Sequence, residues 1–273
     1  SLNRNWSRKL PLKIMSRDNV TGYIQESSNT AQALLTEKVM KYRIFDHVEL
    51  FIKDPLPKGF DLTKVLDKIH KNIPENMLAE IDMILIGEFP MLQKNDFDAY
   101  YADGAIYLTH KQNSESDMYD DIVHELAHSL ESSLSMEIYG DGQLEYEFIA
   151  KRRMLYHLLS QHGYNSMSQM DFLNPDYSKS FDNFLYKEVG YDTIRNIAPN
   201  LFLSPYGATS LREYFANGFE KLYVTKEKDH IKKVSPKLYE KLEQLYYMGR
   251  FDAETEMAYN MEDEKGWSNK HGY

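Results

Sequence analysis

The segment DDIVHELAHSLE, residues 120–131, places two histidines four residues apart, with a glutamate directly after the first. If the segment is a helix, one turn brings the imidazoles of His124 and His128 to the same metal ion. Glu125 lies beside them, where a carboxylate can take a proton from a water molecule at the ion. This pattern is typical of zinc hydrolases. The plain alternative is an amphipathic helix whose polar side is solvated.

The residues around this motif predict a helix with one apolar side. Aspartates crowd its start, where the helix dipole favours negative charge (Asp117, Asp120 and Asp121). At about 100° per residue, the apolar side chains gather opposite the two histidines and Glu125 (Ile122, Val123, Leu126, Ala127, Leu130 and Leu134). A lone histidine on the polar side is most often solvated, but a pair at this spacing favours a metal site.

The third metal ligand decides the type of site, and the residues alone leave it open. A metzincin would carry a third histidine six residues past His128, but that position is Leu134. A glutamate on a following helix is the other common ligand. The candidates are Glu145 and Glu147 in LEYEF and Glu213 in LREYFANGFE, with His157 and His162 as outside alternatives.

Glu213 also has a purely structural interpretation. Ser210, three residues earlier, makes SLRE a capping box, in which the glutamate side chain returns to the start of its own helix. The same helix has an apolar stripe, and Glu213 points nearly opposite to it (Leu211, Tyr214, Phe215, Gly218, Phe219 and Leu222). Helical geometry therefore keeps Glu213 as a candidate ligand without assigning it.

The segment SPYGATSLREYFANGFEKLY resembles the second motif of the anthrax lethal factor family of zinc peptidases, which includes smaller secreted relatives that cut proline-rich sequences. Tyr206 begins the motif's tyrosine–glycine pair, and Glu213 follows it by seven residues, ahead of two aromatics and an alanine. VHELAH matches the first motif, DGAIYL resembles the strand before it, and SPKLYEKLEQLY resembles the closing helix. The similarity covers the chain from about residue 80 to residue 246.

The resemblance implies a zinc-dependent endopeptidase of the gluzincin type. It implies one zinc ion per chain with His124, His128 and Glu213 as ligands. It also implies Glu125 as general base and Tyr206 as hydrogen-bond donor to the developing oxyanion. The substrate would be an extended peptide or protein, paired through main-chain hydrogen bonds with the strand around GAIYL. The family implies secretion, and an inactive zincin-fold protein that binds peptides or a partner is the alternative function.

Two positions depart from the family pattern. Asn217 stands where the family usually has a second glutamate, and Glu131 stands where it usually has an aspartate. Both positions belong to the residues that orient the ligands and tune the metal. The departures therefore bear on zinc affinity and reaction rate more than on the identity of the ligands.

The elements that must position these residues form an α+β pattern, with strands first and helices later. HVELFIKD and IDMILIG predict strands, AYYADGAIYLTH a further strand with a bulge or turn at Asp103-Gly104, and DLTKVLDKIHKNI a short helix. We expect an N-terminal α/β region of unassigned role over residues 1–75 and a polar tail over residues 247–273. Residues 76–246 would form a zincin-like catalytic domain with a small sheet, an active-site helix and a mostly helical C-terminal half.

Composition excludes several classes of function. The 273 residues include no cysteine, which excludes disulfides, a thiol nucleophile and cysteine-bound metal. A net charge of -10 argues against nucleic-acid binding, which needs a basic face. No run approaches about eighteen apolar residues, so we expect no membrane span. The chain opens without the apolar core of a signal peptide, and its oligomeric state is left open.

Overall fold

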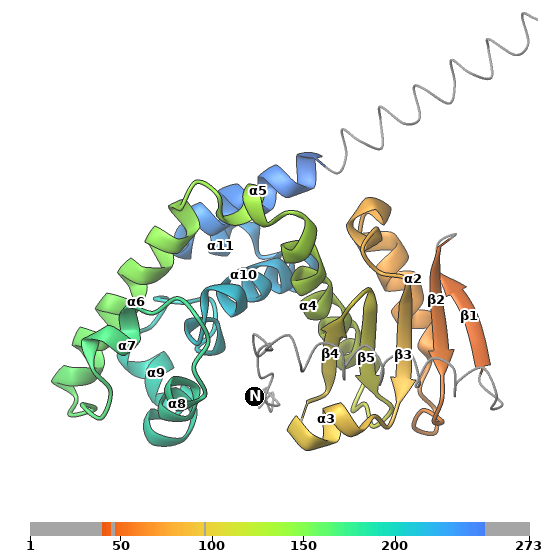
Figure 1. The fold of residues 1–273 in the computed structure, drawn as a ribbon, viewed down its shortest axis with the longest axis horizontal. Coiled ribbons are helices and arrows are strands. Elements are labelled where there is room, and N and C mark those ends of the chain that lie inside the picture. The colour runs from red at the N-terminus through yellow and green to blue at the C-terminus, as the bar shows by residue number, and fades with distance from the viewer. Residues whose placement is uncertain (1–39, 45–46, 96, 249–273) are drawn as a thin grey trace, which may run out of the picture.

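The computed structural model describes residues 40–44, 47–95 and 97–248 (Figure 1). Over these ranges the chain is α+β, with a five-stranded sheet in the N-terminal part and a helical C-terminal part. The predicted α+β class is confirmed. The first 39 residues and most of the predicted polar tail lie outside the described residues.

The sheet is mixed, with the strand order β1-β2-β3-β5-β4. Its inner pairs, β2 with β3 and β3 with β5, are parallel, and its outer pairs are antiparallel. The strands are β1 (Met40–Ile44), β2 (Val48–Ile52), β3 (Met83–Gly87), β4 (Ala99–Ala102) and β5 (Ala105–Thr109). Strand β2 lies before residue 75 and strand β3 lies after it. Because these strands pair, the sheet includes parts of both the predicted N-terminal region and the predicted catalytic domain.

The turn between β4 and β5 divides the single strand predicted for AYYADGAIYLTH into two. Asp103 and Gly104 both have positive φ, at 45° and 79°, which lets the chain reverse tightly. Strand β5 consequently lies inside the sheet, paired with β3 on one side and with β4 on the other. The predicted role of GAIYL as the substrate-pairing strand is therefore wrong, because β5 has no free edge. The free edge on this side of the sheet, within the described residues, belongs to β4.

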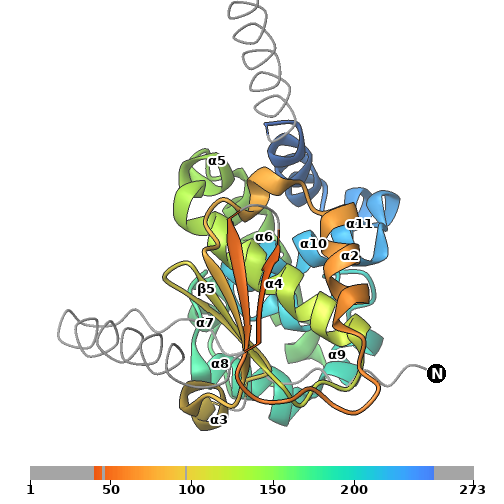
Figure 2. The ribbon, with the colours of Figure 1, turned by 90° about the vertical axis from the view of Figure 1, so that its right-hand side faces the viewer.

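The two faces of the sheet pack against different helices. Leu50, Ile84 and Ile106 lie opposite one another on three adjacent strands and are fully buried in the main core. That core includes residues of α2 (Leu62–Asn72), the 3₁₀ turn η1 (Glu75–Leu78) and α4 (Glu115–Ser133). Figure 2 shows α2 and α4 on the same side of the sheet. The opposite face packs a smaller apolar cluster around α3 (Pro90–Asn95).

The C-terminal part is a set of helices that bring α10 against α4. They are α5 (Ser135–Tyr139), α6 (Gln143–Gln161), α7 (Gln169–Leu173), α8 (Lys179–Asn183), the π-helical η2 (Phe184–Val189), α9 (Tyr191–Ile197), the 3₁₀ turn η3 (Tyr206–Ala208), α10 (Leu211–Glu220), the π-helical η4 (Lys221–Thr225), α11 (Lys228–Val234) and a last helix over residues 236–248. α10 contacts α4, α6 and η3, and Figure 1 shows it beside α4.

A glycine lets the last helix approach α10 closely. A methyl group on Gly218 would lie 2.4 Å from Cδ2 of Leu238, which is shorter than any real carbon–carbon contact. The last helix therefore packs directly against α10 at Gly218, where Leu238 is fully buried. Among the helices of the described ranges, none has the length and apolar content to cross a membrane.

Candidate metal centre

Both sides of α4 are buried, including its polar side. Ser114 caps the helix by accepting a hydrogen bond from the backbone N–H of Asp117 at 3.1 Å. The acidic residues of the first turn also suit the helix start, where the helix dipole favours negative charge. The apolar side faces the sheet, as the periodicity predicts. On the polar side His124 is only 1% exposed and Glu125 only 5%, because α10 packs against His124 and β4 lies against Glu125. The alternative of a solvated polar side is therefore wrong.

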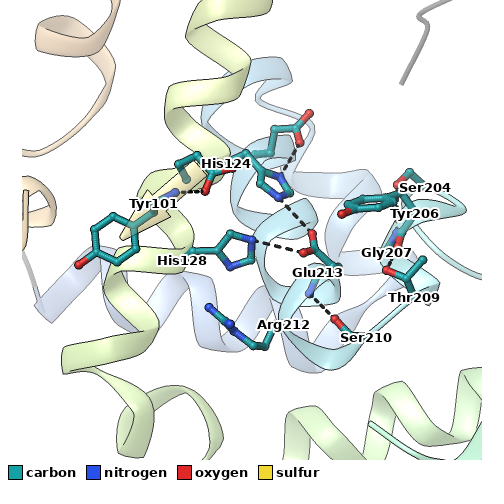
Figure 3. A network of polar contacts seen from close by, with 12 residues as sticks. Tyr101, His124, His128, Ser204, Tyr206, Gly207, Thr209, Ser210, Arg212 and Glu213 are labelled. Atoms are coloured by element: carbon teal, nitrogen blue, oxygen red, sulfur yellow. Dashed lines mark hydrogen bonds and ion pairs between the residues drawn. The ribbon is translucent and has the colours of Figure 1, made fainter. Parts of the chain in front are cut away.

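Two imidazoles and one carboxylate converge between α4 and α10. His124 Nε2 lies 3.1 Å from Oε2 of Glu213, and His128 Nε2 lies 3.5 Å from Oε1 of the same carboxylate (Figure 3). Their candidate ligand atoms all lie within 4.8 Å of one another. Nitrogen and oxygen ligands that share one ion at about 2 Å are separated by about 3–4 Å. This buried group could hold a metal ion.

The other proposed third ligands have different surroundings. Glu147, on α6, accepts a hydrogen bond from the Tyr214 hydroxyl at 2.9 Å. It also accepts the backbone N–H groups of Lys237 at 2.8 Å and Leu238 at 3.1 Å, and so caps the last helix. The remaining alternatives are exposed on α6 or just past its end (Glu145, His157 and His162). Of the candidates left open by the sequence, the structure brings only Glu213 to the two histidines.

The capping-box interpretation of Glu213 is half right. Ser210 caps α10, since its hydroxyl accepts the backbone N–H of Glu213 at 3.2 Å. The Glu213 carboxylate does not complete the box and instead faces His124 and His128. The capped backbone fixes the first turn of α10 and so holds this side chain toward α4.

The three side chains form a strongly coupled charge group. Burial raises the pKa of the Glu213 carboxyl, but the neighbouring His128 and His124 outweigh this effect and hold it well below its usual range. Burial lowers the pKa of His128, but the negative charges of Glu213 and Glu131 outweigh this and raise it to about 10. The metal-free site therefore holds a protonated His128 beside an ionised Glu213, and a metal ion would replace that proton.

Each histidine has a carboxylate on its second ring nitrogen. Glu131 Oε2 lies 2.7 Å from Nδ1 of His128, and Glu131 in turn accepts from Nε of Arg212 at 3.0 Å and from the Tyr139 hydroxyl. With Nδ1 protonated toward the carboxylate, the Nε2 lone pair is directed to the metal position. The structure thus places Glu131, one of the two departures from the family pattern, on the second ring nitrogen of His128.

The corresponding partner of His124 is Glu220, which the sequence reasoning missed. Its Oε2 lies 3.3 Å from Nδ1 of His124. Asn217 lies elsewhere, close enough to the turn after Tyr206 that a methyl group on Gly207 would be 3.1 Å from its Oδ1. The sequence contained one signal for Glu220. It comes seven positions after Glu213, and a residue at that spacing lies two turns further along the same side of a helix.

Glu125 lies on the sheet side of the metal position. Its Oε2 accepts the backbone N–H of Tyr101 in β4 at 2.8 Å (Figure 3). This N–H belongs to the outer edge of the sheet, since β5 pairs with the other side of β4. Glu125 is therefore held next to the histidines by the edge strand.

Tyr206 approaches the site from the opposite side. Its ring centroid lies 6.3 Å from that of His124, and the side chain extends toward His124 and Glu213 (Figure 3). The hydroxyl is buried and has no hydrogen-bond partner among the described residues. Burial, with the negative charge of Glu213, raises the phenol pKa well above its usual range. Tyr206 therefore keeps its phenol proton, and its side chain extends toward the group of His124, His128 and Glu213.

No family model, curated protein sequence or solved structure matches the chain. The likeness to the lethal factor family is therefore a resemblance of the sequence motifs around His124 and Glu213. The function of the site is inferred from those motifs and from the geometry of its side chains.

Proposed function

We propose that this protein is a zinc-dependent endopeptidase with a zincin-like fold. One observation carries the proposal: the Nε2 atoms of His124 and His128 converge on the Glu213 carboxylate, with the Glu125 carboxylate on one side. On the other side lies the Tyr206 hydroxyl, which has no hydrogen-bond partner among the described residues. These are the groups that peptide hydrolysis at a metal ion needs, and they come together from distant segments of the chain.

The donor set fits zinc better than other common ions. Two imidazoles and one carboxylate are a known ligand set of catalytic zinc sites, which keep a fourth position open. Magnesium and calcium prefer sites made of oxygen alone, whereas two of the three ligand atoms here are nitrogens. The carboxylates on both Nδ1 atoms are the outer contacts that histidine ligands of zinc usually have.

Zinc, when bound, would supply Lewis acidity toward a peptide carbonyl and toward water. Glu125 accepts a proton from the attacking water and passes it to the leaving amine. Because Oε2 of Glu125 is held by the Tyr101 N–H, its Oε1 remains available for that proton. Tyr206 donates its hydroxyl hydrogen to the oxygen on which negative charge develops.

The substrate that best suits this arrangement is an extended peptide segment. The outer edge of β4 offers its remaining main-chain groups to another strand, and its Tyr101 N–H, which is bound to Glu125, places this edge beside Glu125. A peptide added along β4 would pass next to the three ligands. We therefore propose β4, in place of β5, as the substrate-pairing strand.

The test compares the wild-type protein with Glu125→Gln. Zinc content and cleavage of a peptide library would be measured by metal analysis and mass spectrometry. We expect one zinc per chain in both proteins, and cleavage about 10²–10⁴-fold slower in the variant. Wild-type protein that binds zinc and peptides without cutting them would support the alternative of an inactive binding protein. Wild-type protein that binds no zinc would refute both.

A further inference from the structure

Arg152 is a buried arginine whose hydrogen bonds go to backbone carbonyl oxygens. It lies on α6 and is 1% exposed. Its Nε donates to Phe172 O at 3.2 Å and its Nη2 to Asp171 O at 2.6 Å. Its Nη1 donates to Ala208 O at 3.0 Å and to Thr209 O at 3.2 Å. One guanidinium thus joins two segments that are far apart in the sequence.

The second of these segments connects Tyr206 to the helix of Glu213. Ala208 ends the turn η3 that begins at Tyr206, and Thr209 precedes Ser210, the cap of α10. Thr209 also donates to the Tyr206 carbonyl, from its backbone N–H at 3.0 Å and from its hydroxyl at 2.8 Å. The guanidinium therefore holds the stretch that carries the proposed oxyanion donor.

A charged group in this position is costly for the fold. Burial of the guanidinium lowers the pKa of Arg152, and an apolar side chain would fill the same space without that penalty. The guanidinium lies over the ring of Phe181, with its central carbon 3.7 Å from the ring centroid. A rigid planar fork stacked on a ring fixes the direction of several hydrogen bonds at once, which a packing residue cannot do.

We propose that Arg152 is a positioning residue for Tyr206, holding the turn so that the phenol hydroxyl faces the metal position. This inference rests on the proposed peptidase function. The competing interpretation is that Arg152 only fastens α6 to α7 and contributes to stability.

A double-mutant cycle separates the two interpretations. Arg152→Lys keeps the charge but cannot bond all four carbonyl oxygens, and Arg153→Lys, at an exposed position next to it, is the matched control. In the zinc-loaded enzyme we expect Arg152→Lys to lower kcat by roughly ten- to a hundred-fold with KM little changed. In a Tyr206→Phe background the same change should have a much smaller effect, because the hydroxyl is already gone. Equal losses in both backgrounds would overturn the proposal.

Hydrogen exchange gives a second measurement that needs no peptidase activity. The backbone N–H groups of Gly207, Ala208 and Thr209 are hydrogen-bonded within the turn. In Arg152→Lys we expect faster exchange over residues 204–210 and unchanged exchange over α4. If Arg152→Lys folds poorly, Phe181→Leu can be measured in its place. It removes the ring beneath the guanidinium and should give the same local effect in weaker form. Exchange that is unchanged over residues 204–210, or that rises evenly along the chain, would overturn the proposal even if the wild-type protein cleaves no peptide.

Discussion

Helices α4 and α6 are both nineteen residues long and both bury charged side chains, but they satisfy those charges in different ways. On α6, Glu147 binds backbone N–H groups and Arg152 binds backbone carbonyls. On α4, the two histidines face a carboxylate from α10. Backbone groups have fixed roles as donors or acceptors, whereas an imidazole and a carboxylate can exchange a proton for a metal ion. A buried charge bound to backbone therefore fixes chain segments in place, whereas buried charges bound to one another could exchange a proton for a metal ion.

The largest expected difference comes from removing either the α10 carboxylate that faces the histidines of α4 or the α6 carboxylate that binds backbone N–H groups. Glu213→Ala should reduce zinc content from one ion per chain to near zero, because the site loses one of its three ligands. Glu147→Ala should keep its zinc and lower the free energy of unfolding by about 1–3 kcal/mol, since it leaves two backbone N–H groups without an acceptor. Metal analysis and urea denaturation measure both. The reverse pattern would move the third ligand to α6.

Two buried tyrosines make the same contrast for hydroxyl groups. Tyr206 has no hydrogen-bond partner among the described residues, whereas Tyr214 donates to Glu147 at 2.9 Å. Tyr206→Phe should lower kcat by about 10²–10³-fold with KM and zinc content little changed, because the hydroxyl acts only when charge develops. Tyr214→Phe should keep normal turnover and lose about 1 kcal/mol of stability. Full activity in Tyr206→Phe would make Tyr206 a packing residue.

The parts of the site that could be predicted are those set by one helix at a time. Helical periodicity alone placed His124, Glu125 and His128 on one side of α4 and directed Glu213 away from the apolar stripe of α10. The choice of Glu213 over the glutamates of α6 needed the family resemblance, because it depends on which helix packs against α4. No local pattern contains that information.

The missed features share this dependence on distant packing. Glu220 contacts His124 only because α10 and α4 cross, and Arg152 binds Ala208 and Thr209 across more than fifty positions of sequence. The error over GAIYL has the same origin, since strand order in a sheet is set by pairing partners and not by the alternation within one strand. Local periodicity assigned elements, and the contacts between elements determined the site.

Glu220 allows a test of the carboxylate that orients His124. Glu220→Gln should lower zinc affinity by about 10–100-fold, since an amide is a weaker acceptor for the Nδ1 proton of His124. Asn217→Ala should leave zinc affinity unchanged, because Asn217 lies against Gly207 and its amide makes no hydrogen bond to either histidine among the described residues. Competition with a chelator of known affinity measures both constants. An effect confined to Asn217→Ala would restore the orienting role to residue 217.

The last comparison concerns how protonation of His128 depends on pH, in the metal-free protein and in the binding of zinc. The pKa of His128 is raised from its ordinary value of 6.5 to about 10, mainly by Glu213 against the opposing effect of burial, so the metal-free protein carries a proton on His128 at pH 7. This raised pKa stabilises the metal-free fold below about pH 6.5, and that contribution is lost as the pH rises toward 10. Metal-free protein should therefore unfold more easily at pH 9 than at pH 7.

Zinc affinity should move in the opposite direction. Each zinc ion displaces about one proton from His128, so the affinity should rise about tenfold per pH unit from pH 7 to pH 9. A histidine with the ordinary pKa would already be neutral, and its zinc affinity would level off just above pH 7. Glu131→Gln removes one of the two negative charges that hold the proton, and should shift this levelling to lower pH. Titration of zinc in buffers from pH 6 to pH 9 distinguishes these curves. A flat wild-type curve above pH 7 would mean that Glu213 and His128 are not coupled as closely as their 3.5 Å separation indicates.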